Sequence, residues 1–301
     1  MPFCPTRCIY CSFTSNPIAK CKKIVEPYIT ALKSEIKAVS QYIKKSKLKL
    51  QCVYFGGGTP TSINDKQFEG LMNFIYKTLI MGNDIQEFTV ECGRPDSITV
   101  SKLETMKKSM VNRISINPQT MNDDTLKLIG RTHSVCDVIE TFKLARSMGF
   151  DDINMDIIIG LPGESSLEVQ NTCLAIEKLK PDSITAHGLS IKRGSQMHEQ
   201  MLKNKLFKIA SQGELIDMYE QTTKLAEKLN MHPYYMYRQK NTVANMENVG
   251  YCVEGKEGIY NIQMIEERQS IAACGAGGVS KIVFLEENRI ERQFKIGRAH
   301  V

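Results

Sequence analysis

Short apolar runs alternate with longer stretches of helical spacing along most of the chain. Five runs rich in apolar and β-branched residues predict strands at 50–55, 87–91, 113–116, 153–159 and 183–187. Apolar residues three and four positions apart predict helices at 26–45, 66–80, 99–108, 123–129, 135–148, 167–179 and 213–230. Strands and helices that alternate in this way predict repeated βα units and a parallel sheet, which is an α/β fold.

The alternation of strand and helix patterns stops after the helix predicted at 213–230, and residues 232–238 are rich in Pro and Tyr. We therefore expect a core domain over residues 1–231 and a small C-terminal α+β segment over residues 232–301. No internal repeat or low-complexity tract stands out.

Composition narrows the class of protein. With 301 residues, 42% of them hydrophobic, the chain can fill a sizeable core. Its net charge of +6 comes from Lys and Arg interspersed with Asp and Glu, which predicts a solvated surface more than a nucleic-acid face. No apolar run approaches the roughly 18 residues of a membrane span. Cys4 follows Met1 too closely for a signal peptide, so we expect a cytoplasmic protein whose ten cysteines are ligands and buried thiols.

The strongest chemical signal is the segment CPTRCIYC, which places Cys4, Cys8 and Cys11 in a CxxxCxxC spacing with Tyr10 before the last cysteine. Three thiolates can ligate three irons of a [4Fe-4S] cluster and leave the fourth iron open to a chelating small molecule. The competing interpretation is a zinc site, which normally needs a fourth ligand, and Cys21 is the nearest candidate. We favour the cluster because the spacing, the aromatic residue and the glycines downstream agree.

A glycine run forms the second signal. Gly56, Gly57 and Gly58, in YFGGGTPT, follow the strand predicted at 50–55. Successive glycines let the backbone approach a ligand closely, at the end of a parallel sheet where α/β sites form. Alone, the run is explained equally well by a tight turn; beside the cysteine motif it becomes specific.

The chain resembles the oxygen-independent coproporphyrinogen III oxidase-like family of radical SAM enzymes, most closely its HemZ type. The resemblance rests on FCPTRCIYCSF, YFGGGTPT, NMDIIIGLPGE, YRQKNTVANMENVGY and GAGGVSK and covers nearly the whole chain. It implies a partial (β/α)6 barrel with parallel strands. It also implies a [4Fe-4S] cluster and S-adenosyl-L-methionine (SAM), which is cleaved to a 5′-deoxyadenosyl radical that abstracts hydrogen from the substrate.

The resemblance also implies SAM contacts at particular positions. These are Gly57, Gly58, Thr59, Glu91, Gln119, Arg131 and Asp156. Carboxylates and amides can hold ribose hydroxyls and an amine, and a guanidinium can pair with a carboxylate. Each residue also has a simpler interpretation, as a polar group at a strand end or a cation at a helix terminus. We favour the SAM contacts, with less support for Gln119, and assign no catalytic residue.

The remaining cysteines and histidines carry weaker signals. His187 ends a predicted strand and could face the cavity, but a lone histidine is more often structural. We interpret the other cysteines as small buried hydrophobic residues, with Cys92 as a possible exception because it follows Glu91. They are Cys21, Cys52, Cys92, Cys136, Cys173, Cys252 and Cys274.

Three features depart from the family. Phe13 stands where established oxidases carry a further cysteine, and HemZ-type and haem-chaperone-like relatives share this phenylalanine. The strand that precedes the cysteine motif in relatives is missing. The last residues, IGRAHV, match the translation of a widely used sequencing adapter, so we expect a fragment truncated at both ends.

The leading functional hypothesis is decarboxylation of coproporphyrinogen III propionates to vinyl groups, with a tetrapyrrole as substrate and a flavodoxin or ferredoxin as electron donor. One alternative is a haem-binding chaperone of the same fold. Another is a radical SAM enzyme that modifies tRNA, which would need a concentrated basic face; the sequence offers only modest runs such as 44–49. We expect neither a membrane nor a nucleic acid as partner.

Overall fold

A seven-stranded sheet forms the centre of the molecule, in a computed structural model that describes residues 1–203, 207–238 and 242–294. The strand order is β3-β4-β5-β6-β7-β9-β8. The first five strands are parallel neighbours, and β9 and β8 continue the sheet in antiparallel fashion. Their bounds are β3 Cys52–Phe55, β4 Glu87–Val90, β5 Arg113–Ser115, β6 Ile153–Ile159, β7 Ser183–Gly188, β8 His232–Tyr237 and β9 Asn248–Cys252. The predicted α/β fold and its five parallel strands are confirmed, as a curled half barrel.

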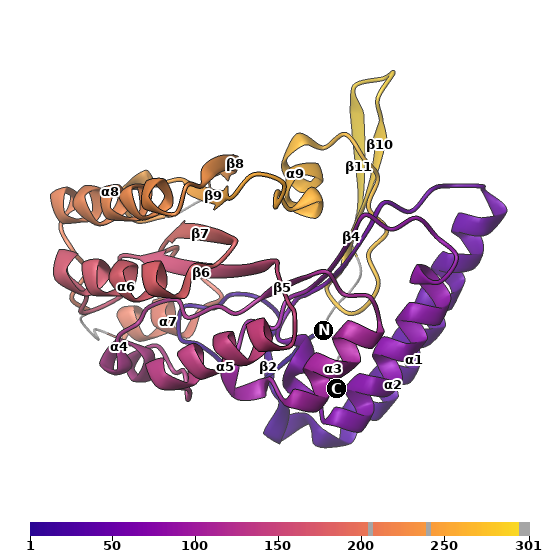
Figure 1. The fold of residues 1–301 in the computed structure, drawn as a ribbon, viewed down its shortest axis with the longest axis horizontal. Coiled ribbons are helices and arrows are strands. Elements are labelled where there is room, and N and C mark those ends of the chain that lie inside the picture. The colour runs from indigo at the N-terminus through magenta and orange to yellow at the C-terminus, as the bar shows by residue number, and fades with distance from the viewer. Residues whose placement is uncertain (204–206, 239–241, 295–301) are drawn as a thin grey trace.

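Helices alternate with the parallel strands along the chain, and further helices precede β3 and follow β7 (Figure 1). They are α1 Ile18–Lys45, α2 Asp65–Ile75, α3 Val100–Lys108, α4 Asp123–Leu128, α5 Val135–Ser147, α6 Ser166–Leu179, α7 Gln196–Leu202, α8 Gln212–Lys228 and α9 Ile259–Glu266. A π-helical turn, Tyr76–Ile80, completes the helix predicted at 66–80. The first helix begins at Ile18, directly after Pro17 and eight residues before its predicted start; its buried stripe runs from Val25 through Ile29 and Leu32.

The two faces of the sheet have opposite character, as β6 illustrates. Alternate residues of this strand are apolar and buried in the main core beneath the helices: Ile153, Met155, Ile157 and Ile159. Asn154 and Asp156 lie between them, and successive side chains of a strand point to opposite faces. On β6 the concave face thus carries the polar residues Asn154 and Asp156, followed by the apolar Ile158, whereas the convex face is apolar throughout.

Several elements were not predicted. No individual strand or helix was predicted after residue 230, yet β8 and β9 extend the main sheet. Helix α9 lies over the β3 end of this sheet, where Tyr260 stacks on Tyr54 with ring centroids 4.0 Å apart. The hairpin β10 (Val279–Phe284) and β11 (Arg289–Phe294) projects from the body (Figure 1). The division between residues 231 and 232 stays a prediction. The segment IGRAHV lies outside the described residues.

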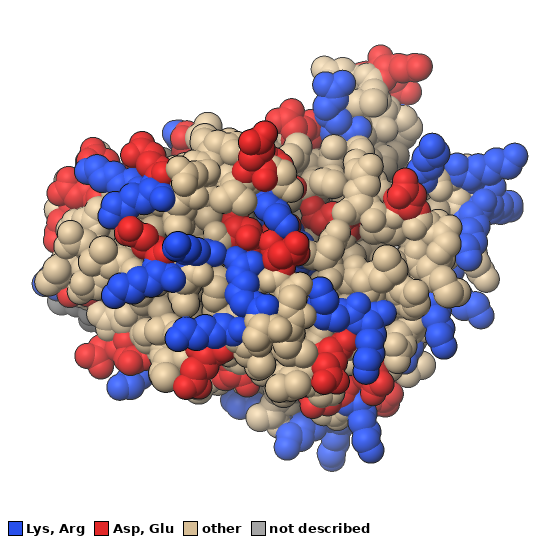
Figure 2. Space-filling model, viewed as in Figure 1, with Lys and Arg blue, Asp and Glu red and all other residues tan. Residues whose placement is uncertain are grey.

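None of the described helices is both long enough and apolar enough to cross a membrane. Lys and Arg are interspersed with Asp and Glu on the face drawn in Figure 2. The expected mixed surface is thus present on this face, with no continuous basic region across it.

Candidate functional site

The cysteine motif forms a loop fastened to the carboxyl ends of the parallel strands. Strands β1 (Phe3–Cys4) and β2 (Asn16–Pro17) pair in parallel and close residues 5–15 into this loop. The Thr6 hydroxyl donates to the Gly130 carbonyl oxygen at 2.7 Å, and the Ile9 amide donates to the Ile129 carbonyl oxygen at 3.0 Å. The loop therefore rests on the segment that follows α4.

Cys4, Cys8 and Cys11 all carry free thiols at this loop. The Thr59 hydroxyl lies 3.5 Å from the Cys4 sulfur, and the Ser15 hydroxyl lies 4.0 Å from the Cys11 sulfur. Burial raises the pKa of both of these thiols, so their thiolate forms need a metal or a cation for stability.

The spacing of the three sulfurs bears on the zinc alternative. Two thiolates bound to one zinc ion at about 2.3 Å lie at most about 4.6 Å apart. Among the described residues, these three thiols do not form a group whose ligand atoms all lie within 4.8 Å of one another. Cys21 instead packs against the main core from α1. In this conformation the three thiols therefore do not form a site shaped for a single zinc ion.

The glycine run lies directly against the start of the cysteine loop. The Gly58 amide donates to the Met1 carbonyl oxygen at 2.6 Å, and the Thr59 amide donates to the Phe3 carbonyl oxygen at 2.7 Å. A Cβ atom on Gly58 would lie 2.5 Å from the Phe3 oxygen and 3.0 Å from the Cys4 sulfur. Gly57 has a φ of +111°, which favours glycine. Close backbone approach therefore requires glycine at both positions.

Two predicted carboxylates lie at this end of the concave face. Glu91, after β4, accepts a hydrogen bond from the Gly57 amide at 3.2 Å, and burial, followed by the charge of Asp156, raises its pKa. Asp156, in β6, accepts from Asn154 at 2.7 Å and lies 3.7 Å from the His187 ring nitrogen. Burial opposes its ionisation, but the hydrogen bonds and charge of His187 hold its pKa below the usual range.

Gln119 and Arg131 border the same region. Gln119 has a φ of +69°, and its backbone pairs with β6 by donating to Asp156 and accepting from Ile158. Arg131 is buried and donates to the Asn117 carbonyl oxygen at 2.6 Å and to the Tyr10 hydroxyl at 3.3 Å. Its Nε has no hydrogen-bond partner, so a buried donor remains available to a ligand.

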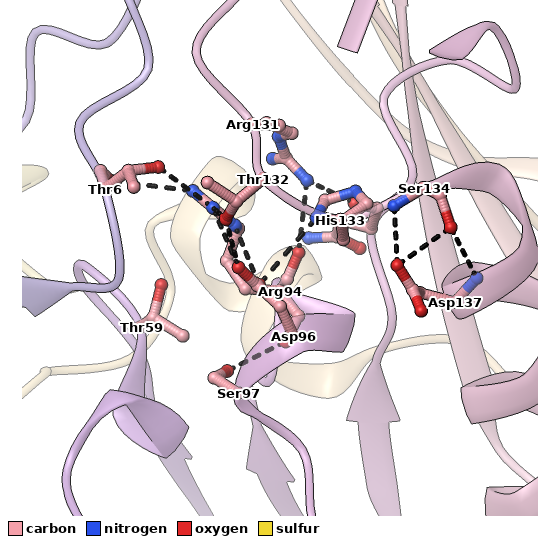
Figure 3. Close-up of polar contacts among 12 residues, drawn as sticks. Thr6, Thr59, Arg94, Asp96, Ser97, Arg131, Thr132, His133, Ser134 and Asp137 are labelled. Carbon is pink, nitrogen blue, oxygen red and sulfur yellow. Dashed lines mark hydrogen bonds and ion pairs between the residues drawn. The ribbon is translucent and has the colours of Figure 1, made fainter. Parts of the chain in front are cut away.

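Arg94, which the sequence analysis did not single out, lies at the centre of a buried network beside the loop (Figure 3). Its guanidinium lies 3.8 Å from the Cys8 sulfur, donates to the Thr6 hydroxyl at 3.0 Å and forms an ion pair with Asp96 at 3.2 Å. Thr132 also donates to Asp96. The segment ECGRPD that carries Glu91 could have indicated this arginine, two residues before an aspartate.

A chain of hydrogen bonds continues along the concave face. Arg113 donates to Ser183 at 2.8 Å, Ser183 donates to Asn154 at 3.1 Å, and Asn154 donates to Asp156. Arg113 also forms a 2.6 Å ion pair with Asp152. The orientation of Asp156 is therefore fixed by groups that extend to the opposite end of the sheet.

The other cysteines are buried less uniformly than predicted: Cys173 and Cys252 are buried, but Cys21, Cys52 and Cys274 are only partly buried. The Cys92 thiol is fully buried and contacts Val90 and Met106, so it points into the core and is no exception to the buried class. Cys136 is exposed on the first turn of α5, where Glu140 one turn later is its partner, so its prediction as buried was wrong.

A surface depression of about 470 Å³ lies at the opposite end of the sheet. Its lining includes Ile85, Asn112 and Asp151, which lie one or two residues before β4, β5 and β6. The predicted residues gather instead at the carboxyl ends of the strands, where sites in parallel sheets form.

The comparisons with known proteins agree with this geometry. The chain is 41% identical over 290 residues to the oxygen-independent coproporphyrinogen-III oxidase-like protein HemZ of Bacillus subtilis, covering 96% of this chain and 57% of that protein. It is 32% identical over 234 residues to the heme chaperone HemW of the same organism, covering 78% and 60%. The structure of Escherichia coli coproporphyrinogen III oxidase, HemN, shares the fold at a TM-score of 0.74 and 19% identity, covering 93% and 63%.

The chain thus spans about three fifths of the length of these relatives. Residues 1–176, more than half of the chain, match the Radical SAM superfamily. On this match, together with the cysteine loop and the half barrel, the chain belongs to the Radical SAM superfamily.

Proposed function

We propose that Cys4, Cys8 and Cys11 ligate a [4Fe-4S] cluster and that SAM binds beside it. The observation that carries this proposal is the meeting of three free thiols, a glycine cradle and two carboxylates at one end of a parallel half barrel. The residues fit both groups, since the thiols are not spaced for one ion and Arg131 keeps an unpartnered buried donor.

The chemical groups of the proposed SAM-binding residues indicate what each of them can do. Gly57, Gly58 and Thr59 are proposed to contact SAM through groups other than the Gly58 and Thr59 amides, which already donate to Met1 and Phe3. Glu91 and Asp156 supply carboxylates for hydroxyl and amine donors. Arg131, and the amide of Gln119, border the same space and suit a carboxylate. When bound, the cluster and SAM together supply a 5′-deoxyadenosyl radical that abstracts hydrogen; the protein orients the reactants and excludes water.

The proposed substrate is a porphyrinogen with propionate side chains, coproporphyrinogen III. Loss of one hydrogen atom, one carbon dioxide and one electron converts each propionate into a vinyl group, and the electron passes to an added acceptor. The similarity to proteins named coproporphyrinogen oxidase or oxidase-like supports this substrate. Tyr54 and Tyr260, stacked at the β3 end of the sheet, offer aromatic surface to a macrocycle.

Anaerobic reconstitution with iron and sulfide, followed by incubation with SAM, coproporphyrinogen III and a reductant, tests this proposal. A reduced flavodoxin or ferredoxin is the donor we propose, and dithionite serves as the chemical control. We expect vinyl-bearing products in proportion to the 5′-deoxyadenosine formed. Deoxyadenosine without decarboxylated product would keep the cofactor assignment and remove the substrate.

A haem-binding chaperone is the second candidate. Two observations favour it: 32% identity to a heme chaperone, and an exposed Phe13 where established oxidases carry a further cysteine. In this case the chain would bind haem tightly and form no product from the porphyrinogen. Haem titration followed by absorbance, run beside the turnover assay, separates the two functions.

A further inference from the structure

Three side chains of metal-binding type meet at the end of the sheet opposite to the cysteine loop. His232 begins β8 and Cys252 ends β9, and the two residues are direct partners across the antiparallel pair. Glu257 follows in the turn before α9. The His232 Nε2 atom lies 3.8 Å from the Cys252 sulfur and 3.0 Å from a Glu257 carboxylate oxygen, and the three ligand atoms all lie within 4.8 Å of one another.

These distances match what one ion of the zinc class requires. Zinc binds imidazole nitrogen, thiolate and carboxylate at about 2.0 to 2.3 Å, so tetrahedral ligands lie roughly 3 to 4 Å apart. We propose that His232, Cys252 and Glu257 form a binding site for a divalent transition-metal ion of the Zn²⁺ class. Among the described residues no fourth His, Cys, Asp or Glu joins this group, so a water molecule would take the fourth coordination position.

The position of the ligands supports the proposal. Two of them lie on paired strands, which hold their separation more rigidly than loops do. The Cys252 side chain is fully buried, while about half of the His232 side chain is exposed, so an ion has a thiol at the base and an open path from solvent. Without a metal, the His232 ring and the Glu257 carboxylate contact each other at the surface, where such polar contacts add little to stability.

Metal binding here would be structural and independent of the cysteine loop. Cys252 pairs with Ser183 at the amino end of β7, whereas His187, beside Asp156, lies toward the other end of that strand. A bound ion would connect β8, β9 and the turn that leads to α9. A thiol must lose its proton to bind a metal, so binding should become tighter as pH rises.

The test uses the full chain with Cys4→Ser, Cys8→Ser and Cys11→Ser, which cannot assemble the proposed cluster. Anaerobic titration of this protein with Co²⁺ should produce thiolate-to-cobalt charge-transfer absorption at one ion per chain. Adding Cys252→Ser should abolish this absorption. Adding His232→Gln, at a half-exposed side chain that folding tolerates, should weaken Co²⁺ binding by more than about tenfold, since even groups that only orient a ligand contribute that much.

Cys173→Ser is the matched control, because Cys173 is also a buried thiol but does not belong to the group of His232, Cys252 and Glu257. It should leave the titration unchanged, and far-ultraviolet circular dichroism should show that every variant is folded. Zn²⁺ should also raise the melting temperature of the chain with the three Cys→Ser changes, but not when His232→Gln is added to it. Absence of charge-transfer absorption in the parent, or its persistence at full affinity in His232→Gln, would overturn the proposal. Neither outcome bears on the cluster.

Discussion

At the scale of single residues, buried charge is concentrated around the cysteine loop. Arg94 and Arg131 are both buried, one next to the Cys8 sulfur and the other beside Tyr10. A buried cation is costly without partners, and here Asp96 and the thiol of Cys8 supply them. In the proposed cluster site, these arginines would compensate the negative charge of thiolate ligands.

The thiols give the first prediction. Changing any one of Cys4, Cys8 or Cys11 to Ala should abolish cluster absorbance and SAM cleavage, because a three-thiolate site has no redundant ligand. Cys21→Ala, which removes a thiol packed against the core, should retain both. Ultraviolet–visible spectra and iron per chain after reconstitution measure the effect. Loss of metal in Cys21→Ala would restore the four-thiolate zinc interpretation.

Arg94 gives the second prediction. Arg94→Met should destabilise the chain by about 3 kcal/mol, because Asp96 loses its buried partner. It should also lower the midpoint potential of the cluster, since a nearby cation favours the more negative reduced form. Urea unfolding and an anaerobic redox titration followed by electron paramagnetic resonance report the two effects.

Arg94→Lys and Arg238→Met are the controls for that experiment. The lysine variant keeps the charge and should recover most of the potential. Arg238 is exposed and paired with Glu247, so its replacement should change neither quantity. An unchanged potential in a folded Arg94→Met protein would assign this arginine to packing alone.

At the scale of elements, the glycine turn after β3 is the junction between sheet and loop, and it gives the third prediction. Gly58→Ala should sharply reduce iron incorporation, because the added Cβ would collide with the Phe3 backbone and crowd Cys4. The matched control is Gly70→Ala inside α2, where a Cβ would meet only the Lys33 side-chain nitrogen at 3.8 Å. That variant should incorporate iron normally and gain about 0.5 to 1 kcal/mol in stability. Equal iron content in both variants would contradict the proposed close approach.

The turn between β6 and α6 gives the fourth prediction. Glu164 accepts a hydrogen bond from the Thr120 hydroxyl at 2.5 Å, and burial raises the pKa of its carboxyl to about 7. Between the unfolded pKa near 4.5 and that value, the folded state binds more protons than the unfolded state, so stability falls as pH rises.

Across that pH range the ionisation of Glu164 should lower the free energy of unfolding by a total on the order of 3 kcal/mol. Glu164→Gln carries no titratable group, so its stability relative to the parent should improve from pH 4.5 to pH 8. Urea unfolding of both proteins at several pH values measures the difference. A difference that does not change with pH would show that Glu164 ionises normally.

The sequence predicted the repeating elements well because their signal is local. Alternation in β6 and the capping residues Ser134 and Ser165, which begin α5 and α6, are properties of neighbouring residues. The pairing of β9 with β7 is not local, since these strands are more than sixty residues apart and antiparallel. Nothing in residues 248–252 alone indicates which edge they join, so this end of the sheet was not predicted.

At the scale of the whole molecule, the candidate site was predictable where motifs mark it and unpredictable where only folding assembles it. The cysteines, the glycines and Glu91 stand in short recognisable segments. Arg94, His187 and the chain from Arg113 to Asp156 act through partners far apart in sequence. Sequence motifs indicated the candidate ligands, while the groups that surround these residues could be identified only from the coordinates.

The attachment of the cysteine loop has a consequence for the order in which the protein is made. Besides its bonds to Ile129 and Gly130, the loop is held by Arg7, which donates to the Gly194 carbonyl oxygen, and by the Met197 amide, which donates to Ile9. A ribosome adds roughly 5 to 20 residues per second, so about 10 to 40 s separate the synthesis of the loop from that of these late partners. During this interval the thiols are exposed to oxidants and to adventitious metals. The loop can therefore acquire all of these hydrogen bonds only after translation has passed residue 197, and the proposed loading with iron and sulfide would follow that point.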